Sequence, residues 1–190
     1  FYNQGTGSFS YGREIHYVDW LEAPVVQSGS PNNPWINTGL KYFPDFEIGV
    51  QLRESVTNTC LGTGSANRLE RNNANNPYWK FTSTQTYVSA IPITEYHVLK
   101  WKNDKIYSDD IYLADATKNS STQSNCMALF GMGTTATSAN GFHNVISFCK
   151  LWNPTDGSLV RDFKPAIDEN GVGFMFDTVS HTCYLNQGTG

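Results

Sequence analysis

Aromatic rings and side-chain amides stand close together in one polar segment of the chain. Tyr78 and Trp79 follow a run of asparagines that includes Asn73, Asn75 and Asn76. An aromatic ring stacks on the apolar face of a pyranose, and amides bind its hydroxyl groups. The segment therefore predicts a sugar-binding surface. The alternative is that Trp79 lies in the core and the asparagines form a plain loop.

A second segment offers the same combination, because Trp35 follows Asn33 at a short distance. We expect these two residues to extend the ligand-binding surface. The alternative again places the tryptophan in the core.

Catalytic residues are not predicted. Polysaccharide-cleaving sandwiches use paired carboxylates about 5 Å apart, and the nearest pair with suitable spacing is Asp45 and Glu47. We interpret both as solvated edge charges, because Gly49 and Gln51 occupy the next positions of that strand face. A Ser-His-Asp arrangement assembled in space stays open, although no sequence feature supports one. We expect the protein not to be an enzyme.

Metal and cofactor sites are also not predicted. Asn103, Asp104, Asp109 and Asp110 could supply oxygen ligands to calcium, but charged hairpins that keep a sheet edge soluble explain them better. The cysteines lack the C-x-x-C spacing of zinc or redox motifs. Two disulfides and four buried thiols both remain open for these four residues, which are Cys60, Cys126, Cys149 and Cys183.

Composition and charge restrict the class of protein. The 190 residues include 5 Trp, 10 Tyr and 11 Phe, against 13 basic and 17 acidic residues, which is typical of one folded domain and not of a disordered chain. A net charge of −4 without a basic cluster argues against nucleic acid as a partner. The absence of an apolar run of about 20 residues argues against membrane insertion. We expect a soluble mature protein, any export signal lying outside this chain.

The two ends of the chain repeat one another. Residues 1–7 and residues 184–190 both consist of two large apolar residues followed by Asn-Gln-Gly-Thr-Gly. This repeat predicts a tandem array, in which residues 1–7 are the end strand of a preceding copy and residues 8–190 form one domain. The alternative is two edge strands of similar composition.

Strands are expected almost throughout. Apolar residues alternate in 46–52, the pattern of a strand with one buried face, and Asn103-Asp104, Asp156-Gly157 and Asn170-Gly171 are turn signals. Polar stretches at 24–34, 67–77 and 118–125 are expected to be exposed loops. The pattern indicates an all-β protein of about a dozen strands. The other expected strands are 96–101, 111–113, 127–132, 145–152, 159–163, 172–176 and 182–185.

Several motifs carry a likeness to a known family: Ile146-Ser147-Phe148, the string from Gly157 to Ala166, Asn186 to Gly190, and the opening pair of Trp20 to Ala23 and Trp35 to Leu40. They resemble motifs of the laminin-G-like, concanavalin-A-like jelly-roll domains that occur in phage virion proteins and large bacterial surface proteins. The resemblance implies a two-sheet antiparallel jelly-roll sandwich. Arg161 and Asp162 are interpreted as a pair that stabilises the fold, and Pro165 as the end of a strand.

The residues and the resemblance together predict a non-catalytic, extracellular module on a bacterial surface or a virion. We expect it to bind cell-surface glycans or to act in adhesion, as one unit of a larger repeated protein. A repeated weak site gains avidity. The alternative is a structural subunit, such as a phage decoration or tail component or a filament unit, that joins neighbouring copies through its end strands.

Overall fold

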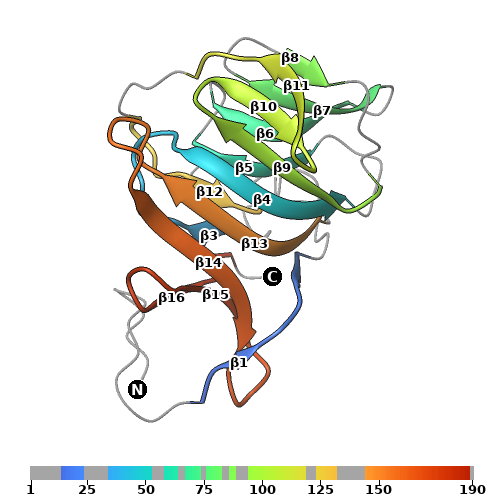
Figure 1. Ribbon diagram of the computed structural model, residues 1–190. Helices are drawn as coiled ribbons and strands as arrows, with labels where there is room; N and C mark the ends of the chain where they lie inside the picture. Colours follow the sequence, from blue (N-terminus) through green and yellow to red (C-terminus); the bar gives the residue numbers. More distant parts are fainter. Residues whose placement is uncertain are drawn as a thin grey trace.

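The computed structural model describes residues 14–23, 34–52, 58–63, 67–73, 76–82, 86–88, 94–118, 123–131 and 144–188. Within these ranges the chain forms strands, turns and irregular segments and no helix (Figure 1). The described part accordingly contains no helix that is long and apolar enough to cross a membrane.

The larger of two antiparallel sheets has ten strands. Eight of them form a continuous series in which each strand is hydrogen-bonded to the next. The short strand β1 pairs with β14, and the short strand β2 pairs with β13. In sheet order these strands are β11 (Ile111–Asp115), β10 (Lys105–Ser108), β9 (His97–Lys102), β4 (Asp45–Leu52), β13 (Asn144–Trp152), β14 (Leu159–Ile167), β15 (Gly173–Asp177) and β16 (Thr182–Leu185), with β1 (His16–Tyr17) and β2 (Leu21–Ala23) beside them.

The smaller sheet has six described strands and lies behind the larger one (Figure 1). The architecture is therefore an all-β, two-sheet antiparallel sandwich of jelly-roll type, as the sequence predicts. In sheet order its strands are β3 (Ile36–Asn37), β12 (Ala128–Leu129), β5 (Asn58–Gly62), β6 (Arg68–Asn73), β7 (Asn76–Thr82) and β8 (Thr86–Val88).

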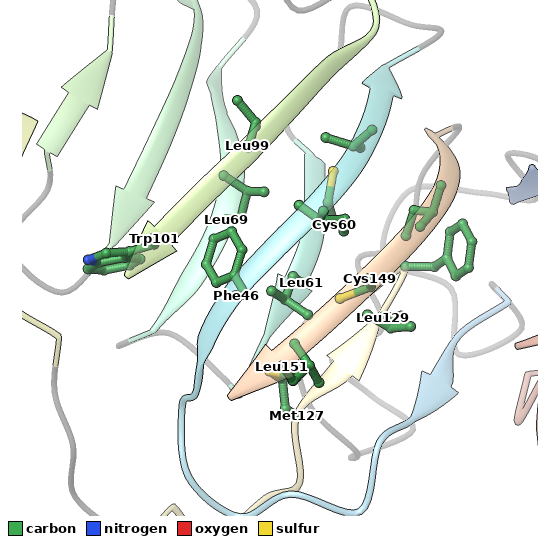
Figure 2. Packing of buried hydrophobic residues seen from close by; sticks show 14 of the residues in the cluster. Phe46, Cys60, Leu61, Leu69, Leu99, Trp101, Met127, Leu129, Cys149 and Leu151 are labelled. Carbon is green, nitrogen blue, oxygen red and sulfur yellow. The ribbon is translucent and has the colours of Figure 1, made fainter. Parts of the chain in front are cut away.

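Alternating apolar residues from both sheets form a single large core (Figure 2). At one end, Trp101 packs edge-on against Phe43, Phe46 and Phe81, with ring centroids 5.6, 6.3 and 5.7 Å away. The indole N–H of Trp101 donates a 2.7 Å hydrogen bond to the carbonyl of Ala116, so burial of this ring leaves no polar atom unpaired.

Two tight turns connect the outer strands of the large sheet. Asn103 and Asp104 have φ of 51° and 57°, and Asp109 and Asp110 have φ of 51° and 65°. Two successive left-handed residues are the mark of the type I′ hairpin, whose twist matches that of the strands it joins. The first of these turns agrees with the turn signal seen in the sequence.

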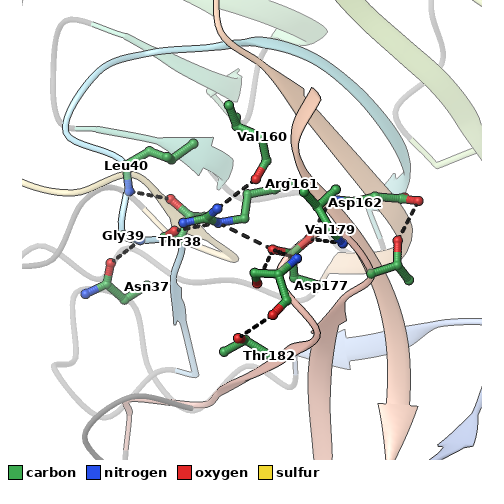
Figure 3. Close-up of polar contacts among 12 residues, drawn as sticks. Asn37, Thr38, Gly39, Leu40, Val160, Arg161, Asp162, Asp177, Val179 and Thr182 are labelled. Carbon is green, nitrogen blue, oxygen red and sulfur yellow. Dashed lines mark hydrogen bonds and ion pairs between the residues drawn. The ribbon is translucent and has the colours of Figure 1, made fainter. Parts of the chain in front are cut away.

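A network between the sheets holds the C-terminal strands (Figure 3). Asp177 is fully buried and accepts hydrogen bonds from the backbone N–H groups of Asp162, Val179 and Ser180. The guanidinium of Arg161 lies 3.7 Å from this carboxylate and also donates to the carbonyl of Thr38. Arg161 thus joins the two sheets, but its carboxylate partner is Asp177 and not Asp162.

Pro165 does not end strand β14, which continues to Ile167. The carbonyl of Pro165 accepts a hydrogen bond from the N–H of Val18, so the proline nitrogen points to the same side, toward β1. That side is where β14 changes its partner from β13 to β1. A missing N–H is tolerated there, and the pairing with β15 is unaffected.

Two other expectations about the chain are wrong. The segment expected as a loop at 67–77 instead contains all of β6 and the beginning of β7. Asp45 is not a solvated charge: it is buried, pairs with Lys118 and accepts a 3.1 Å hydrogen bond from the N–H of Asn103. Glu47 is partly exposed and lies 3.2 Å from the Lys100 ammonium.

None of the four cysteines, all of which the structure describes, forms a disulfide, so the disulfide alternative does not hold in this structure. Cys60 and Cys149 belong to the main core, and Cys183 is buried in a smaller cluster with Ala166 and Phe174. Burial raises the pKa of the Cys60 and Cys149 thiols far above the ordinary value. These thiols therefore act as small apolar side chains.

Candidate functional site

The tryptophan at the centre of the predicted sugar surface lies in the core. Trp79 is fully buried among the residues of the main cluster, so its ring cannot stack on a sugar and this prediction is wrong for Trp79. The backbones of Asn73, Asn76 and Tyr78 belong to β6 and β7, but the structure does not describe their side chains. Asn75 lies outside the described residues.

The second predicted tryptophan is also mostly buried. Trp35 is 8% exposed and lines a cavity of about 180 Å³ together with Glu22, Phe130 and Asn186. Sites that enclose ligands of sugar size or larger measure roughly 300 Å³ or more, so this cavity is too small for a saccharide. Asn33 lies outside the described residues.

A larger groove lies on the outer face of the ten-stranded sheet, away from the core. Its volume is about 600 Å³, within the range of ligand-binding sites. It combines aromatic rings, a hydroxyl group and charges of both signs. The lining residues are Tyr17, Val18, Ser147, Phe148, Lys150, Asp162, Lys164 and Pro165.

A β-bulge in β13 builds the floor of this groove. The pairing with β4 shifts between Ile146 and Phe148, so that Ser147 and Phe148 together oppose Gly49. Ile146 before the bulge and Cys149 after it both belong to the core. Two consecutive side chains, those of Ser147 and Phe148, therefore lie on the outer face, where a regular strand would place one.

Gly49 is required for this arrangement. A Cβ atom at position 49 would lie 2.2 Å from both Ser147 Oγ and Tyr96 Oη, and 2.8 Å from Phe148 Cε1. The two hydroxyl groups lie 2.6 Å apart, within hydrogen-bond distance. Because Gly49 has no side chain, the hydroxyl groups of Ser147 and Tyr96 and the ring of Phe148 can lie directly over β4.

The opposite wall of the groove comes from β1 and β14. Tyr17 is 57% exposed, and its ring is held edge-on against Phe176 with the centroids 6.1 Å apart. An exposed ring in a fixed orientation is suited to stacking on a sugar. The groove therefore carries the combination of rings and polar groups that the sequence predicted elsewhere.

The charged groups of the groove are largely unpaired. Asp162 accepts a 2.9 Å hydrogen bond from Thr178 through Oδ2, but its Oδ1 is shielded from solvent and has no donor. Lys150 lies directly across the strand pair from Asp162, yet its ammonium lies over the Phe148 ring, 5.8 Å from the centroid. Unsatisfied polar groups of this kind are rare in proteins and need an explanation.

Sequence reasoning missed this groove because it needs β1, which is distant in the sequence from the hairpin of β13 and β14. One signal was available, namely the isolated glycine at position 49 within an alternating strand. Such a glycine marks a bulge or the close approach of another group. It would have directed attention to the outer face of β4.

One serine, one histidine and one aspartate meet where β9 begins and β10 ends, but their geometry is not that of a catalytic triad. Asp109 Oδ2 lies 2.8 Å from His97 Nδ1 and 2.9 Å from Ser108 Oγ. His97 Nε2 is buried and has no partner. A triad places its serine and its aspartate on opposite ring nitrogens, whereas here both lie on the Nδ1 side.

The carboxylates considered as calcium ligands instead make hydrogen bonds and an ion pair that stabilise the hairpins. Asp104 Oδ1 accepts from the N–H of Lys118, Asp109 Oδ1 accepts from the N–H of Val98, and Asp110 pairs with Lys100. Among the described residues, no group of three or more His, Cys, Asp or Glu side chains is arranged to hold a metal ion.

Comparison with known proteins identifies a structural neighbour and no relative by sequence. No family model and no curated protein matches the chain. A crystal structure of a "putative carbohydrate binding protein" from Bacteroides ovatus ATCC 8483 superposes with a TM-score of 0.60 at 13% sequence identity. The match covers 90% of this chain and 59% of the neighbour, so the chain spans less than two thirds of that protein. At this identity the likeness shows the fold alone.

Proposed function

We propose that this protein is a non-catalytic carbohydrate-binding module and that the outer-face groove is its binding site. The observation that carries the proposal is that two aromatic side chains, Tyr17 and Phe148, line the same groove as Ser147, Lys150 and Asp162. Rings that cover the apolar face of a sugar, with polar groups around them for its hydroxyls, are what saccharide recognition requires.

The structural neighbour supports this proposal through its sandwich fold and its description as a carbohydrate binding protein. In keeping with the motifs of the laminin-G-like jelly rolls, we propose an extracellular module of a bacterial surface or virion protein that takes part in adhesion. The proposal includes no reaction, because neither the Ser108 cluster nor the groove offers an activated nucleophile or a carboxylate pair.

The direct test is a glycan array probed with the full chain, followed by calorimetry on each saccharide that binds. Tyr17→Ala and Phe148→Ala should each weaken binding about two- to tenfold, since an aromatic contact contributes on the order of 0.5–1.5 kcal/mol. Tyr112→Ala is the matched control, because Tyr112 is 51% exposed on the opposite edge of the same sheet. Unchanged affinity in both groove variants would refute the site.

A second candidate function rests on the repeated end segment. Asn186 bridges to Ile36, its Oδ1 accepts a 3.1 Å hydrogen bond from the N–H of Trp35, and Gln187 donates to the Trp35 carbonyl. The Asn-Gln-Gly sequence thus adds itself to the edge of the smaller sheet. Residues 1–7 carry the same sequence, so in a structural subunit they would occupy this edge in a neighbouring copy.

Sedimentation separates the two candidates. A structural subunit would form concentration-dependent oligomers that disappear when residues 1–7 are deleted. A monodisperse monomer with glycan affinity would exclude this second function, and oligomers that persist after the deletion would exclude the strand exchange.

A further inference from the structure

We infer that the groove selects an acidic saccharide, one whose rings carry a carboxylate or a sulfate group. The inference rests on the proposed function and adds the chemical class of the ligand. Lys150 and Lys164 both line the groove, against the single carboxylate of Asp162. This local excess of positive charge stands in a chain whose net charge is −4.

The two lysines are available to a ligand. Neither ammonium lies within ion-pair distance of a carboxylate among the described residues, whereas Lys100 on β9 and Lys118 beyond the end of β11 are both paired. Lys164 is exposed, and Lys150 is partly buried with its ammonium over the Phe148 ring. A partly desolvated cation with no counterion is stabilised by an anionic ligand.

Strand geometry places these charges to act together. Asp162 and Lys164 are two residues apart on β14 and so share the outer face, and Lys150 faces Asp162 from β13. Asp162 does not neutralise its neighbours by contact, because neither lysine ammonium lies within ion-pair distance of its carboxylate, whose Oδ2 accepts from Thr178 instead. A sugar unit that carries an anion matches this set, because its anion can pair with both lysines that line the groove.

Two carboxylates elsewhere on this face are already paired and so do not offset the lysines. Glu47 and Asp110 on the outer face both pair with Lys100. Lys102 adds a further cation, 4.6 Å from the centroid of the Trp152 ring. The outer face therefore presents its unpaired positive charge at the groove and beside it.

The experiment compares acidic saccharides with a neutral match. The full chain is titrated calorimetrically with an oligogalacturonate, with its methyl ester, which has the same rings without the charges, and with a sulfated heparin oligosaccharide. We expect one of the two acidic probes to bind at least tenfold more tightly than the ester. Binding should weaken as NaCl rises from about 50 to 500 mM, because salt screens the ion pairs.

Lysine variants locate the effect. Lys150→Met and Lys164→Met should each weaken binding of the acidic probe about five- to tenfold, the range for a charge-assisted contact at a partly exposed site. Lys105→Met is the control, since it removes the same charge from an exposed position of the same sheet. A loss of equal size in the control would reduce the effect to general charge attraction and overturn the inference.

Other outcomes distinguish this inference from the proposed function. If neutral saccharides bind as tightly as acidic ones, and Phe148→Ala weakens both, the acidic class is wrong and the carbohydrate site stands. If neither acidic probe binds, the inference is overturned. If no saccharide on the array binds and the ring variants change nothing, the proposed function fails as well.

Discussion

The two faces of the ten-stranded sheet use similar side chains for different purposes. On the inner face, Phe46 and Trp101 are fully buried and their rings contact one another. On the outer face, Tyr17 and Phe148 line a groove and have polar neighbours. Aromatic residues therefore do not mark the site by themselves. The strand register and one bulge decide which rings reach solvent.

The largest expected effect is the loss of an inner ring. Phe46→Ala removes a fully buried side chain and leaves a cavity, so the free energy of unfolding should fall by about 3–5 kcal/mol. Phe148→Ala should cost only about 1 kcal/mol, because its ring is partly exposed. Urea denaturation of both variants measures the difference. Equal losses would show that Phe148 belongs to the core, and the two faces would no longer differ.

The polar network between the sheets is next in size. Asp177→Asn leaves the Arg161 guanidinium without its carboxylate and replaces an acceptor with a donor among backbone N–H groups. We expect a loss of about 3 kcal/mol in the free energy of unfolding. Asp115→Asn, at an exposed position of β11, should stay within about 0.5 kcal/mol. A small effect at Asp177 would mean that this buried carboxylate and its pairing with Arg161 contribute little to stability.

Gly49→Ala tests the outer face with a single added methyl group. The new Cβ would collide with Ser147 Oγ and Tyr96 Oη, both at the ends of side chains that can move. We expect a loss of about 1–2 kcal/mol in stability and at least a tenfold loss of glycan affinity. Gly62→Ala is the control. Gly62 belongs to the smaller sheet, away from the groove, and its new Cβ would lie 2.9 Å from Arg68 Cβ in the same sheet. If Gly49→Ala kept its glycan affinity, the packing of Ser147, Tyr96 and Phe148 over Gly49 would not be needed for binding.

The smallest perturbation is chemical labelling of the thiols. Cys126 is partly exposed, while Cys60, Cys149 and Cys183 are buried. Burial raises the pKa of Cys183 to about 12 and makes the thiolate rare at neutral pH. An aromatic disulfide reagent should modify one thiol quickly in the native protein and four after unfolding. Cys126→Ser should abolish the fast reaction, and a second fast thiol would show that the interior opens.

Sequence patterns predicted the strands of the larger sheet well. Thr182 to Leu185 forms β16 as expected, and the segment expected from Val145 to Trp152 forms β13 with one added residue. Alternation was informative there because one face is buried and the other is not. The strands β6 and β7 were missed because asparagine is rare in strands. In those strands Leu69 and Phe81 supply the core contacts that outweigh this preference.

The binding site could not be predicted in the same way. The prediction from residue types centred on Trp79, whose side chain is fully buried and therefore not at the surface. The groove depends on the pairing of β14 with both β13 and β1, and a single sequence does not reveal which distant strands pair. Gly49 is the one residue whose type indicated, from the sequence, that other groups pack closely against this strand.

The bulge at Ser147 also bears on how such a site can arise. It adds one residue to β13 and leaves the core positions on either side in place. Insertion or deletion of a single codon would therefore create or remove the bulge that forms the floor of the groove. Related sandwiches can gain or lose this surface in one evolutionary step, with no substitution in the interior. We expect the length of β13, more than the identity of its residues, to differ between relatives that bind ligands here and those that do not.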